Sequence, residues 1–149
     1  MTMKTRLEDD LKQAMRSRDA ARRDVIRYLR SEIRNQEIKV QEDLDDDGVV
    51  QVLSRQAQQR RDSIEAFTEA NRSDLVEKEQ AELEIIMEYM PQQMTSDEIT
   101  SLVQEVVAEV GASGPGDMGK VMSQIMPQVR GRAEGREVSS IVMEILRGL

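Results

Sequence analysis

Residues 117–136 read DMGKVMSQIMPQVRGRAEGR, and they join a Met-rich pattern, a proline and a loop in which two glycines separate three arginines. The apolar positions of the first part recur every three or four residues, which is typical of one face of a helix. Asp117 predicts the start of this helix, and Pro127 predicts its end nearby. No other stretch combines a flexible backbone with clustered cations, so we expect the rest of the chain to serve as helical scaffold.

The segments on either side of this stretch complete a small helical module. Thr95 and Glu98 have the spacing of a capping box, which predicts a helix start. Apolar stripes follow at Ile99, Leu102, Val103, Val106, Val107 and Val110, and again at Val138, Ile141, Val142, Ile145, Leu146 and Leu149. Residues 95–149 are therefore predicted to form a three-helix bundle, close to the lower size limit for an independent core.

The N-terminal part carries further helical stripes, in residues 4–17, 18–41, 49–70 and 75–90. Pro91 cannot continue the last of these helices, so residues 91–94 are interpreted as a linker after an N-terminal helical hairpin module of residues 1–90. No stretch alternates apolar and polar residues at period two, and we therefore predict an all-α protein.

An acidic turn, EDLDDDG, occupies residues 42–48. Its spacing of acids matches the first half of a calcium-binding EF-hand loop, but the twelfth position is Ser54, where a bidentate Glu is required. We interpret the turn as a connector that caps the next helix.

A second group of cations lies in residues 18–41, where Arg23, Arg27, Arg30 and Arg34 recur at steps of four, three and four. They line one side of the predicted helix and could follow a phosphate backbone. The interleaved acids favour instead a solvated face on which the arginines pair with Asp19, Asp24 and Glu32.

The composition limits the chemistry. The formal net charge is −8, there is no Cys and no His, and the aromatic residues are one Phe and two Tyr. The core must be aliphatic, and the commonest general base, thiol nucleophile and metal ligand are missing. We expect no catalytic residue, cofactor or metal site in this chain. With no apolar run long enough to span a bilayer and no secretory signal, we expect a cytoplasmic protein that binds no membrane.

The loop of residues 117–136 supplies the candidate site. Arg130, Arg132 and Arg136 offer planar donors suited to phosphates, and Lys120 adds a fourth cation. Gly131 and Gly135 permit backbone angles closed to other residues and the close approach of a partner. A tight turn between helices with solvated arginines explains the same residues equally well on physical grounds.

These residues resemble the YqeY family of small bacterial proteins, which is similar to the C-terminal tail of the GatB subunit of the aspartyl/glutamyl-tRNA amidotransferase. The resemblance is strongest in residues 117–122 (DMGKVM), 126–127 (MP) and 131–135 (GRAEG). It is weaker in residues 89–91 (YMP), 95–99 and 71–75 (NRSDL). The resemblance runs nearly the full length in order. The family usually has Leu where this chain has Met90, and Gly where it has Asn71.

The resemblance implies an all-helical fold and a role in holding tRNA, with ATP use and amide transfer located in domains that this chain lacks. By this resemblance the chain could be classed as a carbon–nitrogen ligase with glutamine as amide donor, although we expect it to lack the active site. Carried over by position, Lys120, Arg130, Arg132 and Arg136 are candidates for contact with tRNA phosphates. The alternative is a protein-interaction module, in which Met118, Met122 and Met126 form an apolar patch for a partner, although their spacing is also that of a buried stripe.

Overall fold

The computed structural model describes residues 1–149 as an all-helical chain without strands, which confirms the predicted fold class. The helices are α1 (Met3–Ser17), α2 (Ala20–Val40), α3 (Asp46–Glu69), α4 (Ser73–Met87), α5 (Ser96–Val110), α6 (Met118–Val129) and α7 (Gly135–Arg147), with a short 3-10 helix, η1 (Pro115–Asp117). The chain divides into two compact units, Met1–Met90 and Pro91–Leu149.

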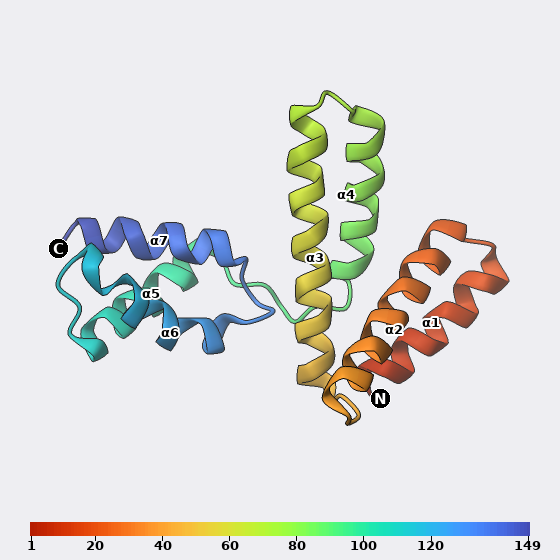
Figure 1. Cartoon of the computed structure of the whole chain (residues 1–149), viewed down its shortest axis with the longest axis horizontal. Coiled ribbons are helices and arrows are strands. Elements are labelled where there is room, and N and C mark those ends of the chain that lie inside the picture. Colours follow the sequence, from red (N-terminus) through yellow and green to blue (C-terminus); the bar gives the residue numbers. More distant parts are fainter. The chain divides into compact units, whose positions relative to one another are not determined.

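The first unit is built from two helical hairpins, α1 with α2 and α3 with α4 (Figure 1). Arg18 ends α1 with φ 59°, and Asn71 lies in the α3–α4 connection with φ 57°, so both short turns use the left-handed region. The shared core is aliphatic, as the composition requires, apart from one tyrosine; its fully buried members include Leu7, Ile26, Leu29, Val49, Leu53 and Ile86.

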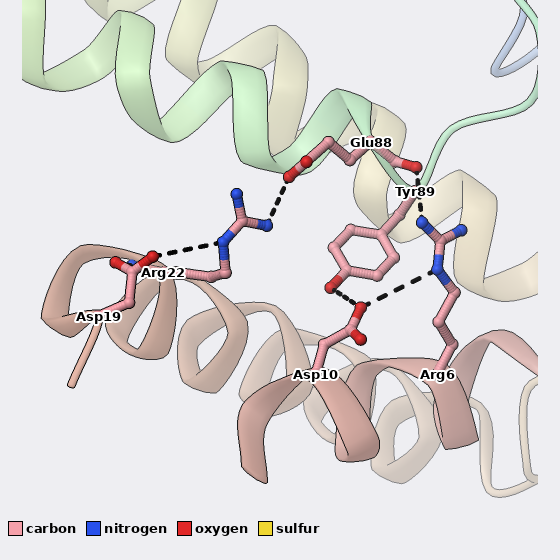
Figure 2. Close-up of polar contacts among 6 residues, drawn as sticks. All are labelled: Arg6, Asp10, Asp19, Arg22, Glu88 and Tyr89. Carbon is pink, nitrogen blue, oxygen red and sulfur yellow. Dashed lines mark hydrogen bonds and ion pairs between the residues drawn. The ribbon is translucent and has the colours of Figure 1, made fainter. Parts of the chain in front are cut away.

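A polar cluster ties the end of α4 to the first hairpin (Figure 2). Tyr89 is buried, and its hydroxyl donates to Asp10 Oδ2 of α1 at 2.5 Å. The guanidinium of Arg6 lies 4.5 Å from the centre of the Tyr89 ring and donates to the carbonyl oxygen of Glu88. Arg22 of α2 donates to the Glu88 carboxylate at 2.6 Å. Residues 88–89 are therefore held by side chains of both α1 and α2.

The second unit is a bundle in which α5, α6 and α7 each pack against the other two (Figure 1), as the sequence predicted. Its core is again aliphatic, with fully buried Ile99, Val103, Val121, Ile125, Val142 and Leu146. Met118, Met122 and Met126 are half-buried and pack against this core. The methionine stripe thus serves largely as core packing.

Several helix boundaries depend on local signals that the sequence carries. Thr95 and Glu98 form the predicted capping box at the start of α5, and Asp45 caps α3 by accepting from Gly48 N at 2.9 Å. Pro127 lies inside α6, which ends two residues later at Val129, so the helix ends close to the proline as predicted. Proline removes only the backbone bond to the residue four positions earlier, and the remaining turn of α6 is held by the buried Val129.

Candidate nucleic-acid interface

The loop between α6 and α7 is a fixed turn. Gly131 is buried and adopts φ +79°, a left-handed conformation that disfavours any residue with a Cβ. The backbone nitrogens of Arg132 and Ala133 both donate to the carbonyl oxygen of Val129, at 2.8 and 3.0 Å. The conformational freedom predicted for Gly131 is therefore used to reverse the chain directly after α6.

The same loop is attached to the segment that precedes α5. Met94 N donates to the carbonyl oxygen of Arg132 at 2.8 Å, and Gln93 Nε2 donates to that of Gly131 at 2.9 Å. Arg132 Nε donates in turn to the carbonyl oxygen of Gln92 at 3.2 Å. Residues 92–94, which belong to the segment 91–94 interpreted from the sequence as a linker, thus hold the loop in place by hydrogen bonds within the second unit.

The three arginines of the loop have different environments. Arg130 is exposed at the C-terminal end of α6, and its side chain makes no hydrogen bond or ion pair. Arg132 is half-buried by its contact with residue 92, and Arg136 is exposed in the first turn of α7. The three cations all lie between the end of α6 and the first turn of α7, and Arg130 is the one whose side chain makes neither a hydrogen bond nor an ion pair.

Lys120 lies at the other end of α6. It is exposed in the first turn of the helix, ten residues before Arg130, which corresponds to about 15 Å along the helix axis. Its charge acts on Asp117: two bonds from Ser113, at 2.8 Å from the backbone and 3.3 Å from the hydroxyl, keep the pKa of Asp117 below its ordinary value, and Lys120 adds to this. The structure therefore separates Lys120 from the arginines.

The two glycines predicted for the site also differ. Gly135 is the first residue of α7, and a Cβ added there would meet only Met126 Cε, at 4.0 Å. This is ordinary van der Waals contact, so the backbone of α7 does not require glycine at this position. Gly131 alone is needed for the turn.

Only some of the ion pairs predicted for the arginines of α2 are present in the structure. Arg22 and Arg23 pair with Asp19 and Asp24 at 3.6 and 3.0 Å, as the interleaved acids suggested. Glu32 pairs with no arginine, and Arg30 and Arg34 make no ion pair. Arg27, Arg30 and Arg34 line a groove between α2 and α1, a position that the sequence pattern of α2 alone does not give.

Comparison with known proteins shows which chains this one resembles. A family model described as Yqey-like protein matches residues 4–146. A protein of Pyrenophora tritici-repentis is 34% identical over 144 residues, which cover 95% of this chain and 79% of that protein. A protein of Lachancea thermotolerans is 43% identical over 112 residues, covering 73% of this chain and 60% of the relative. A Saccharomyces cerevisiae relative is 39% identical over 94 residues, 51% of its own length.

All three relatives carry the name "Altered inheritance of mitochondria protein 41, mitochondrial". The predicted cytoplasmic location is therefore wrong by this comparison. The prediction rested on the absence of a bilayer-spanning apolar run and of a secretory signal, and neither property distinguishes the cytoplasm from mitochondria. No helix of the structure has both the length and the apolar character needed to cross a membrane.

Proposed function

Because the chain belongs to the YqeY-like family, we propose that it is a non-catalytic accessory module that binds tRNA phosphates through the loop at the α6–α7 end of its second unit. The resemblance to the GatB tail supports tRNA as the proposed ligand. The observation that carries the proposal is the environment of Arg130, an exposed guanidinium without an ionic partner beside a turn fixed by Gly131.

The loop is held in one conformation by hydrogen bonds, which favours its binding to tRNA phosphates. The hydrogen bonds from Gln93 and Met94 to residues 131 and 132 fix the backbone before any ligand arrives. A ligand that binds a fixed loop loses less conformational entropy than one that must order it. Arg130 also has no intramolecular ion pair that binding would have to break, so its interaction with a phosphate adds directly to affinity.

The formal net charge of −8 sets the expected strength of binding. Charges further from the phosphate than about 8 Å are largely screened at physiological ionic strength, so the acidic surface weakens the attraction without abolishing it. Contacts between arginines and phosphates release counterions and therefore depend steeply on salt. We expect modest affinity that falls quickly as the salt concentration rises.

Catalysis is assigned to partners in this proposal. The chain has no His and no Cys, and an amide transfer associated with related amidotransferases would take place on other subunits. The competing hypothesis of a protein-binding methionine patch is less favoured, because Met118, Met122 and Met126 are half-buried against the core of their own bundle.

A titration with bulk tRNA tests the proposal. The protein and its Arg130→Gln variant are compared at low salt with Arg147→Gln, which removes one exposed charge from the far end of α7 and serves as the matched control. We expect about fivefold weaker binding for Arg130→Gln and little change for Arg147→Gln, because only the first substitution removes a group that binds a phosphate. Equal effects of the two variants would remove the loop from the interface.

A further inference from the structure

A groove of about 580 Å³ lies between α1 and α2 in the first unit. Its apolar lining comes from Leu7 and Ile33, both buried, and from the half-buried Leu11. Its polar lining consists of Lys4, Thr5, Glu8, Arg27, Arg30, Ser31, Arg34 and Glu37. The volume is within the range of about 300–1,000 Å³ that is usual for small-molecule sites.

Three arginines form one wall of this groove. Arg27, Arg30 and Arg34 follow one another on α2 at steps of three and four residues, so they share a helical face. Their Cα atoms span about 10 Å along the axis at the rise of an α-helix. Neighbouring guanidinium groups at this spacing can bind several anionic groups of one extended ligand.

The acids of the groove already have other partners. Glu8 pairs with Lys12 at 3.7 Å. Glu37 pairs with Lys4 and accepts from Leu44 N at 2.8 Å. The bond from Lys4 is the main reason that the pKa of Glu37 is low, and the charge of Arg34 contributes least.

The arginines, by contrast, are without carboxylate partners. Arg30 and Arg34 make no ion pair, and Arg27 contacts only the sulfur of Met15, at 4.0 Å. The groove wall therefore carries three guanidinium groups that no ion pair holds, in a chain whose formal net charge is −8. Bidentate guanidinium groups are best satisfied by phosphate or carboxylate oxygens.

We propose that this groove binds a small molecule with a run of phosphate groups, of the nucleoside polyphosphate class. Arg27, Arg30 and Arg34 hold the phosphates, and the half-buried Leu11 provides the accessible apolar surface that receives the base or sugar. The groove is closed on one side by helix α1 and has the size of a small ligand, which favours a nucleotide over a long nucleic acid. This inference does not depend on tRNA binding by the second unit.

Isothermal titration of the full chain with adenosine triphosphate and with inorganic tripolyphosphate tests the inference at low salt. We expect saturable binding of both, tighter for the nucleotide because tripolyphosphate cannot use the apolar surface. The triple variant Arg27→Gln, Arg30→Gln, Arg34→Gln should bind at least about 30-fold more weakly, since it lacks the three guanidinium groups that bind the phosphates.

The control is a second triple variant, Arg16→Gln, Arg18→Gln, Arg55→Gln. It removes three exposed arginines of the same unit that also lack ion pairs but do not line this groove. It should keep wild-type affinity, and circular dichroism should show unchanged helix content in both variants. Equal weakening by the two triples, or no saturable binding of either phosphate compound, would overturn the proposal.

A third titration uses a single-stranded RNA oligonucleotide in place of the two small phosphate compounds. If RNA bound through Arg27, Arg30 and Arg34 while neither small compound did, the assignment to a nucleotide would be wrong. The Arg130→Gln variant of the second unit should leave nucleotide binding unchanged, so failure of tRNA binding and failure of this inference are distinguishable.

Discussion

Arg132 Nε donates to the carbonyl oxygen of Gln92 at 3.2 Å, so one of the three arginines expected to contact RNA also fastens its own loop to the segment before α5. Arg130, two residues earlier, has no such contact. Replacing each of the two arginines should therefore have different effects, although the sequence predicted the same role for both.

Replacement of Arg130 by Gln should weaken tRNA binding and leave the melting temperature unchanged, because the side chain has no partner in the protein. Replacement of Arg132 by Ala should weaken binding and also lower the free energy of unfolding by about 1 kcal/mol, the usual contribution of one hydrogen bond. Thermal melts of the two variants beside their tRNA titrations measure this split. Similar melting temperatures for both would mean that the bond to Gln92 contributes nothing to stability.

The two loop glycines give a matched pair for backbone strain. Gly131→Ala places a Cβ at φ +79° and should destabilise the protein by about 1–2 kcal/mol. Gly135→Ala occupies the first position of α7 with room for the Cβ, and it should be neutral or stabilising by up to about 1 kcal/mol. Urea denaturation of both variants provides the comparison. A loss of stability for Gly135→Ala equal to that for Gly131→Ala would contradict the geometry of the turn.

Tyr89 should contribute to stability through its hydroxyl. Tyr89→Phe removes the 2.5 Å bond to Asp10 but keeps the ring under Arg6, so we expect a loss of about 1–2 kcal/mol in the free energy of unfolding. Tyr28→Phe, which changes an exposed tyrosine, should alter it by less than about 0.5 kcal/mol. A loss no larger for Tyr89 than for Tyr28 would show that the bond is not maintained in solution.

The environment of Tyr89 also predicts how the free energy of unfolding changes at high pH. Burial, and then the bond to Asp10, raise the pKa of Tyr89 above its ordinary value of 10.0. Because the pKa of Tyr89 is raised in the folded state, its contribution to the free energy of unfolding is complete below pH 10 and declines as the pH rises above it. Above pH 10 the tyrosine of the unfolded chain loses its proton more readily than that of the folded chain. Denaturation curves between pH 8 and about 11 should show this decline in the wild type and a smaller one in Tyr89→Phe.

Most of the fold could be predicted from local patterns, since each helix depends on signals close in sequence. The capping box of Thr95 and the apolar stripe of α5 are examples. Pro127 placed the end of α6 only to within a few residues, because the helix continues to Val129, which packs in the core. Gly131 was predicted as a turn residue because few residues other than glycine adopt its backbone angles, which is also a local property.

The candidate site was less predictable because it depends on contacts between distant residues. The bond between Arg132 and Gln92 joins positions 40 residues apart. Lys120 and Arg130 are close in sequence but lie at opposite ends of one helix, and only the helix geometry separates them. The groove of Arg27, Arg30 and Arg34 likewise needs the packing of α1 against α2, which no pattern within α2 contains.

The salt dependence of tRNA binding tests the central claim most directly. The protein is titrated with bulk tRNA at a series of salt concentrations, beside a double variant, Arg130→Gln with Arg136→Gln, that retains Arg132 and its bond to Gln92. The proposed interface predicts salt-sensitive binding whose slope, log K against log salt, is shallower in the double variant by about one unit for each phosphate that the variant no longer binds. No binding by the wild type at low salt, or the same slope for both proteins, would contradict it.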